Sequence, residues 1–146
     1  MTNISEESFH MMFEDALHGF PYECCGFLFG HEDGNDRIIT AIQKVSNISH
    51  EDKRRRYSIS ATDYLNAERH AEENNYSLLG IYHSHPDHPA IPSETDRLSA
   101  QPYFSYVIIS VMNNQVSHVR SWVLNDAEQF VEEDINQFKL SEKIKS

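Results

Sequence analysis

The segment that begins at His83 limits the fold of this chain more than any other part of the sequence. It follows an apolar run, Leu78–Tyr82, of the kind that forms a buried strand. Side chains two residues apart on a strand point to one face, so His83 and His85 should direct both imidazoles the same way. A proline-rich connection then leads to Ser93, which is expected to cap a short helix with Asp96 in its first turn. The chain must therefore run from the end of this strand back to the start of a helix that lies beside the two histidines.

Two imidazoles and one carboxylate form a donor set that zinc takes. A catalytic zinc site has three protein ligands and leaves its fourth position to water. We therefore predict that His83, His85 and Asp96 hold one Zn²⁺ per chain. Two simpler interpretations remain open at this point: a His-x-His pair can occur on a surface strand by chance, and Ser93 and Asp96 can form a capping box and nothing more.

Glu23 is the unusual residue of the predicted strand Glu23–Gly30. The rest of that strand is largely apolar, and a carboxylate at its start is costly to bury unless it is paired or has a task. A metal-activated water needs a base, and Glu23 is our candidate. The alternative is a solvated charge at the start of the strand.

Together these residues resemble the motif of the JAMM (MPN-plus) zinc metalloproteases. The motif consists of a glutamate, here Glu23, followed by His83-x-His85, seven residues, Ser93, two residues and Asp96. The short chain and the Pro-x-Glu-x-Cys-Gly sequence around Glu23 resemble the bacterial members. The resemblance extends over most of the chain, and every motif position is filled.

The resemblance implies a fold, an activity and partners. The fold is a cytidine-deaminase-like α/β sandwich. The activity is hydrolysis of the amide bond after the C-terminal Gly-Gly of ubiquitin-like β-grasp proteins, and short bacterial members often act on sulfur-carrier β-grasp proteins. Glu23 would be the general base, and Ser93 would donate a hydrogen bond to the oxyanion. The two insertions with which eukaryotic relatives grip ubiquitin have no room in this length, so polyubiquitin is not an expected substrate. Family members often dimerise, which leaves a homodimer open.

Three alternative functions are compatible with parts of this motif. A non-catalytic MPN scaffold would bind partners without zinc, but such proteins usually lack a ligand, and none is missing here. A zinc deaminase would need His-x-Glu and Pro-Cys-x-x-Cys patterns. Here the cysteines, Cys24 and Cys25, are adjacent, and they are expected to be buried apolar residues. RadC-like relatives carry Asn where this chain has Ser84.

Composition restricts the partners. The net charge of −11 repels a phosphate backbone, so we expect no nucleic-acid partner. The local exception is Lys53 with Arg54, Arg55 and Arg56, which form either a solvated loop or a patch that binds an acidic protein partner. No apolar run reaches membrane length, and the acidic start lacks the features of a signal peptide. With the adjacent cysteines, which cannot pair with each other without severe strain, this suggests a cytoplasmic protein.

The hydrophobic patterns predict one α+β domain over residues 1–146, with a mixed, curved β-sheet and flanking helices. The tail, residues 139–146, is expected to fray. Helices are predicted after Ser5, from about Ser60 to Asn74, and over Ser93–Ala100. Strands are predicted over Glu23–Gly30, Arg37–Asn47, Tyr57–Ile59, Leu78–His85, Tyr106–Val111 and Ser117–Leu124, with a final edge segment over Gln129–Ile135.

Overall fold

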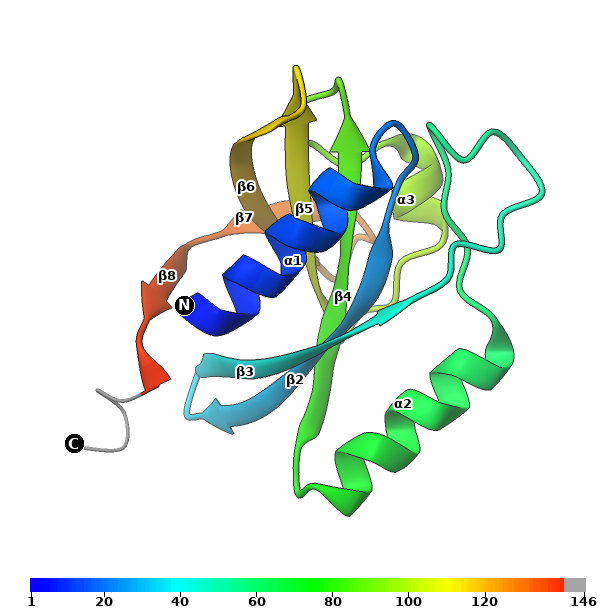
Figure 1. Ribbon diagram of the computed structural model, residues 1–146. Coiled ribbons are helices and arrows are strands. Elements are labelled where there is room, and N and C mark those ends of the chain that lie inside the picture. The colour runs from blue at the N-terminus through cyan, green and yellow to red at the C-terminus, as the bar shows by residue number, and fades with distance from the viewer. Residues whose placement is uncertain (141–146) are drawn as a thin grey trace.

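The computed structural model describes residues 1–140, which form one mixed sheet with helices on both faces (Figure 1). The strands of the sheet lie in the order β7-β6-β5-β4-β2-β3-β1-β8. They are β1 (Thr2–Ser5), β2 (Cys25–Asp33), β3 (Asp36–Val45), β4 (Ser77–Pro86), β5 (Ser105–Met112), β6 (Gln115–Leu124), β7 (Phe130–Glu133) and β8 (Ile135–Phe138). The helices are α1 (Glu6–Gly19), α2 (Ala61–Glu73) and α3 (Glu94–Leu98).

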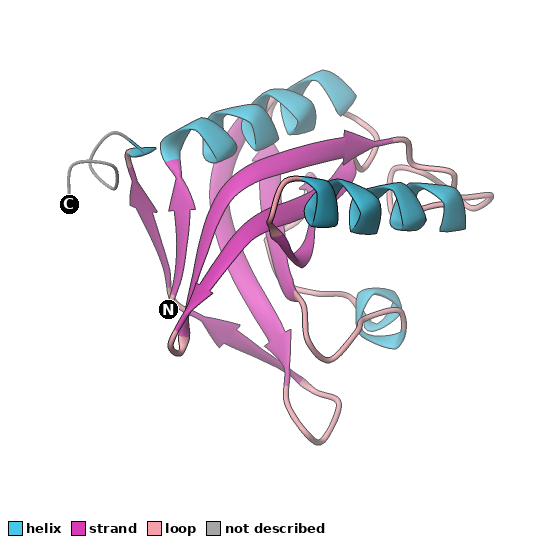
Figure 2. Ribbon diagram, turned by 90° about the horizontal axis from the view of Figure 1, so that it is seen from below, coloured by secondary structure: helices cyan, strands magenta, loops and turns pink. Residues whose placement is uncertain are grey.

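The sheet is strongly curved, as predicted (Figure 2). β7 and β8 lie at opposite ends of the strand order, yet Asp134 alone separates them in the chain. The Asp134 carbonyl accepts from the backbone N–H of Thr2, and the Thr2 hydroxyl lies 2.7 Å from a carboxylate oxygen of Glu133. The two ends of the strand order are therefore joined through Asp134 and Thr2.

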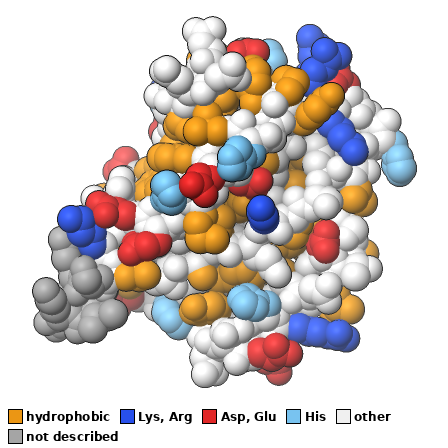
Figure 3. Space-filling model, in the orientation of Figure 1, with side chains coloured by type: hydrophobic (Ala, Val, Ile, Leu, Met, Phe, Trp, Pro, Cys, Tyr) orange, Lys and Arg blue, Asp and Glu red, His pale blue; other side chains and the backbone are white. Residues whose placement is uncertain are grey.

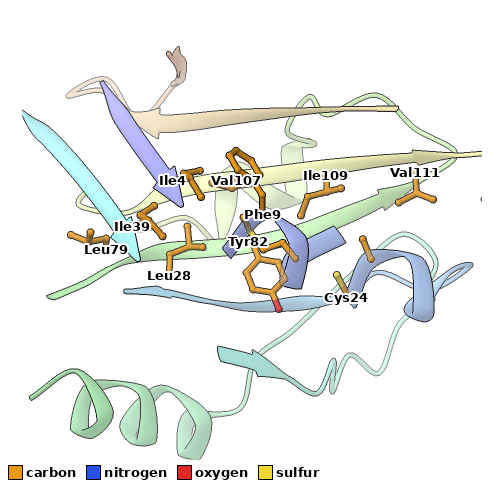
Figure 4. Packing of buried hydrophobic residues seen from close by; sticks show 12 residues of the cluster. Ile4, Phe9, Cys24, Leu28, Ile39, Leu79, Tyr82, Val107, Ile109 and Val111 are labelled. Atoms are coloured by element: carbon orange, nitrogen blue, oxygen red, sulfur yellow. The ribbon is translucent and has the colours of Figure 1, made fainter. Parts of the chain in front are cut away.

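Helix α1 packs on one face of the sheet. Ser5 caps it by accepting a hydrogen bond from the backbone N–H of Ser8. Its buried residues, three and four apart, meet side chains from the central strands (Figure 4). The cluster comprises Ile4, Phe9, Met12, Ala16, Cys24, Leu28, Ile39, Leu79, Tyr82, Val107, Ile109 and Val111.

Helix α2 covers the opposite face. Ala67 and Ala71 on this helix pack with Phe27, Phe29 and Ile81 of β2 and β4. From Gly80 onward, where β4 has passed the irregularity in its pairing with β2, side chains alternate between the two faces, with Ile81 on the α2 side and Tyr82 on the α1 side. This alternation places both histidines of β4 on the α2 face of the sheet, continuing the row begun by Ile81.

The structure differs from the predicted elements in three places. Strand β1 was not predicted, because four residues that run directly into a helix carry too little pattern. The predicted final segment, Gln129–Ile135, contains β7, which pairs with β6, but a further strand, β8, begins where that segment ends and pairs with β1. The predicted strand Tyr57–Ile59 is wrong: these residues pair with no strand, and their side chains pack against the α2-side cluster instead. Of the tail expected to fray, residues 141–146 lie outside the described residues.

Within residues 1–140, none of the helices combines the length and the apolar composition needed to cross a membrane.

Candidate metal centre

Three ligand atoms converge where β4 ends. The Nε2 atoms of His83 and His85 lie 3.1 Å apart. The Oδ2 atom of Asp96, from α3, lies 3.4 Å from Nε2 of His83 and 3.2 Å from Nε2 of His85. The histidines are 1% and 6% exposed, so the cluster is closed to solvent on the side of the sheet. The predicted ligand set is therefore brought together.

The crossover between β4 and α3 fixes the orientation of His85. Nδ1 of His85 lies 2.8 Å from the carbonyl oxygen of Pro89, which can only accept, so Nδ1 carries the proton. In the neutral ring, Nε2 then presents a lone pair to the cluster. A hydrogen bond from a ligand histidine to a carbonyl is the usual way in which a protein sets tautomer and ring orientation.

Helix α3 positions Asp96 through a capping box. The hydroxyl of Ser93 accepts from the backbone N–H of Asp96, and Oδ2 of Asp96 accepts from the backbone N–H of Ser93. The interpretation of this pair as a capping box is thus correct, but the same Oδ2 atom also faces the two histidines. The Ser93 O–H donates to no other residue within 1–140, which leaves it free to donate to a substrate.

Charge in the cluster favours a cation. Burial is the largest influence on the pKa of Asp96 and raises it, but the charge of His83 and the hydrogen bonds that the carboxylate accepts together outweigh burial and hold the pKa well below its usual range. Burial lowers the pKa of His83, but the charge of Asp96 and its hydrogen bond, together with the charge of Glu23, outweigh burial and raise that pKa. The ionised carboxylate of Asp96 and the Nε2 lone pair of His85 therefore face each other. Oδ2 and Nε2 are 3.2 Å apart, and neither atom carries a proton.

The geometry fits zinc. When ligand atoms lie about 2.0–2.1 Å from a tetrahedral metal, they lie about 3.3 Å from each other. The three separations here, 3.1, 3.2 and 3.4 Å, match that value. A divalent cation among the three atoms would also satisfy the two facing lone pairs. The residues present therefore suit the metal that the motif predicts.

Glu23 lies two residues before the start of β2 and is only 5% exposed. Its Oε1 atom is buried and has no hydrogen-bond partner among residues 1–140. Burial raises the pKa of Glu23 to about 7, opposed by His83 and reinforced by Asp96. The solvated-charge interpretation is therefore wrong. A buried, unpaired carboxylate that titrates near neutral pH has the properties of a general base.

A cavity of about 320 Å³ joins the predicted site residues. Glu23, His85 and Ser93 line it, together with Arg55 and Arg56 from the loop at residues 46–60. In Figure 3, Lys and Arg side chains gather at the upper right of the molecule, where Figure 1 shows this loop. Two of the three arginines singled out in the sequence thus reach the site, and Arg54 does not line this cavity.

Several residues around the site were not predicted. The Asn47 side chain donates to the carbonyls of Glu23 and Arg56, which ties the base to the basic loop. The Tyr57 ring stacks on His83 with ring centroids 4.5 Å apart. An asparagine before a polar loop and a tyrosine after a run of arginines are common patterns, so no signal in the sequence identified either residue.

Two residues of β6 hold the crossover through the buried residue Ala90. The indole N–H of Trp122 donates to the Ala90 carbonyl, and the Ala90 N–H donates to Nε2 of His118. The Ser110 hydroxyl, from β5, donates to the carbonyl of His88. The backbone that accepts from His85 is thus anchored on both of its sides. No role was predicted for His118, and the structure shows that it holds the backbone of the crossover.

Comparison with known proteins identifies the family. The family model of prokaryotic homologs of the JAB domain matches residues 5–125. The chain belongs to this JAB family. A desampylase from Haloferax volcanii is 34% identical over 106 residues, covering 72% of this chain and 74% of the relative. A CysO-cysteine peptidase from Mycobacterium tuberculosis is 31% identical over 126 residues, covering 86% and 83%. The predicted JAMM-type hydrolase class is confirmed at the level of the family.

Solved structures confirm the JAB fold. A protein from Desulfitobacterium hafniense superposes with a TM-score of 0.84 at 28% identity and covers 95% of this chain and 94% of its own. A JAB1/MPN domain protein from Archaeoglobus fulgidus reaches a TM-score of 0.60 at 14% identity, covering 95% and 98%. The predicted α+β class, a mixed sheet with flanking helices, is thereby confirmed.

Proposed function

We propose that this JAB protein is a zinc-dependent peptidase that hydrolyses the amide bond after the C-terminal Gly-Gly of a ubiquitin-like or sulfur-carrier β-grasp protein. The names of its relatives, a desampylase and a CysO-cysteine peptidase, support a hydrolase that acts on small carrier proteins. The zinc ion, its single copy and the roles of the residues are parts of the same proposal.

One observation carries the proposal. The ligand atoms of His83, His85 and Asp96 converge at separations of 3.1, 3.2 and 3.4 Å. The cavity beside them also contains the buried carboxylate of Glu23 and the hydroxyl of Ser93. A scaffold that only binds partners has no use for a buried carboxylate without a hydrogen-bond partner, which costs stability.

The residues of the chain divide the chemistry among them. His83, His85 and Asp96 would hold the zinc ion, which when bound would act as a Lewis acid and lower the pKa of a water to near 7. Glu23 accepts a proton from the attacking water and delivers it to the leaving amine, for which a pKa of about 7 suits both steps. The Ser93 O–H donates to the oxygen of the scissile carbonyl as negative charge develops there. The water oxygen bonds to the carbonyl carbon, and the C–N bond breaks.

Hydrolysis of a carrier extended by one residue beyond Gly-Gly tests the proposal. We expect the zinc-loaded protein to release that residue, as measured by the mass of the carrier. Glu23→Gln should lower the rate by at least about a hundredfold, because general-base catalysis contributes about 10²–10⁴-fold. A wild type that binds zinc and the carrier without cutting it would favour the non-catalytic scaffold instead.

A further inference from the structure

The cavity beside Glu23 has a cationic wall. Arg55 and Arg56 line the same space of about 320 Å³ as Glu23, His85 and Ser93. The chain as a whole carries a net charge of −11, so two arginines beside a carboxylate base are not explained by composition. A guanidinium at this place attracts an anionic group of whatever enters the cavity.

The three arginines of the segment differ in their partners. Nε of Arg54 lies 3.1 Å from Oδ1 of Asp52, and this pair lines another hollow, which Arg55 also lines, but not the Glu23 cavity. Nε of Arg56 lies 3.4 Å from Oε2 of Glu51, and its guanidinium also donates to the carbonyl of Arg55. The guanidinium of Arg55 makes no hydrogen bond or ion pair within residues 1–140. Arg55 is therefore the arginine available to a ligand.

The chemistry of the proposed reaction decides which part of a substrate occupies this cavity. Glu23 hands its proton to the leaving amine, so the leaving residue must lie on the Glu23 side of the site. A second hollow, of about 250 Å³, lies beyond Ser93 and Ile91 and is lined by Trp122 and Phe130. Glu23 does not line that hollow, which therefore suits the acyl part of the substrate, the Gly-Gly tail.

We propose that Arg55 is a specificity-determining residue whose guanidinium binds the free α-carboxylate of the single amino acid released after Gly-Gly. This inference rests on the function proposed above. A residue joined through its α-amine to the tail carries its carboxylate close to the bond that breaks, within the Glu23 cavity. A lysine joined through its side-chain amine has its carboxyl in a peptide bond and offers no such charge. The protein thus favours one-residue extensions over isopeptide-linked proteins.

Paired substrates test this specificity. Ubiquitin and a bacterial sulfur-carrier β-grasp protein, each extended by one alanine beyond Gly-Gly, are prepared with a C-terminal acid or a C-terminal amide. We expect the zinc-loaded wild type to hydrolyse the acid of at least one carrier with kcat/KM at least tenfold higher than its amide. Arg55→Gln should remove that preference by slowing hydrolysis of the acid alone. Arg54→Gln, the matched control on the same loop, should preserve the preference.

Binding separates this inference from the function on which it rests. The Glu23→Gln variant should bind the acid at least tenfold more tightly than the amide in calorimetry, and adding Arg55→Gln should equalise the two. Equal binding together with equal hydrolysis of acid and amide would overturn the role of Arg55 and leave the hydrolase intact. Tighter binding of the acid by a wild type that cuts neither substrate would overturn the hydrolase and retain the carboxylate site.

Discussion

Nδ1 of His85 donates a hydrogen bond to the carbonyl oxygen of Pro89 at 2.8 Å, and this contact fixes which nitrogen faces the metal site. The contact joins two segments that are adjacent in sequence, but the crossover that carries Pro89 is held by β6, from far along the chain. Trp122 and His118 both bond to Ala90, the next residue. The orientation of a ligand therefore depends on a strand that contributes no ligand.

Trp122→Phe should weaken zinc binding. The change keeps an aromatic ring but removes the N–H that donates to Ala90, so the crossover and its bond to His85 become less constrained. Loss of a residue that hydrogen-bonds a metal ligand typically lowers metal affinity by about 10–100-fold. Trp122 bonds to Ala90, next to the Pro89 carbonyl that accepts from His85, so we expect zinc affinity to fall by up to about tenfold. Competition with a chelating dye measures it. Arg120→Gln, an exposed change on the same strand, should bind zinc as the wild type does; equal affinities for all three proteins would contradict the role of Trp122.

Ser93→Ala should affect catalysis and stability separately. Removing the oxyanion donor should lower kcat by about 10²–10³-fold, and removing the helix cap should lower the free energy of unfolding by about 1 kcal/mol. Ser93→Thr keeps the hydroxyl and should restore most of both losses. Steady-state kinetics and urea unfolding measure the two effects. An alanine variant that is less stable but has an unchanged kcat would show that Ser93 is a cap and nothing more.

Glu23→Gln should stabilise the metal-free protein, and more so at high pH. A carboxyl with a folded-state pKa of about 7 holds its proton in the folded protein after the unfolded chain, with its ordinary pKa of 4.5, has lost it. Stability of the wild type therefore falls as the pH rises from about 4.5 to 7, and glutamine removes this loss. We expect the gain in free energy of unfolding to grow by about 2–3 kcal/mol between pH 5 and pH 8. A gain of the same size at both pH values in urea unfolding would count against the buried, unpaired state of Glu23.

Leu28→Ala should destabilise the fold without altering the site. Leu28 is fully buried in the cluster between α1 and the sheet, on the face opposite to the histidines. Truncation of a buried leucine costs about 2–5 kcal/mol, which urea unfolding measures. Leu98→Ala is the matched control, because Leu98 is 72% exposed and its truncation should change stability by less than about 0.5 kcal/mol. Equal effects of the two changes would contradict this description of the core.

The sequence was sufficient to predict the parts of the site that depend on local pattern. Alternation along a strand placed His83 and His85 on one face, and a capping box placed Asp96 at the start of a helix, so the candidate ligands could be named before their distances were known. Glu23 stood out because burying an isolated carboxylate is costly. Each of these patterns lies within a few consecutive residues of the chain.

Contacts between distant segments could not be predicted in this way. Asn47 joins Glu23 to Arg56, and Trp122 holds the crossover, but neither residue departs from an ordinary local pattern. Strand β1 was missed for a related reason, since its place between β3 and β8 depends on parallel pairing with both of them. Tyr57 has a strand-forming neighbourhood, yet its ring is used to cover His83. Tertiary contacts overrode local preference at these positions.

The zinc content of the purified chain tests the central claim most directly. After exposure to zinc and removal of the excess, elemental analysis should find about one zinc per wild-type chain and almost none in His85→Ala or Asp96→Ala, with the fold of both variants checked by circular dichroism. A wild type that retains no zinc, or variants that retain as much as the wild type, would contradict a metal centre built from His83, His85 and Asp96.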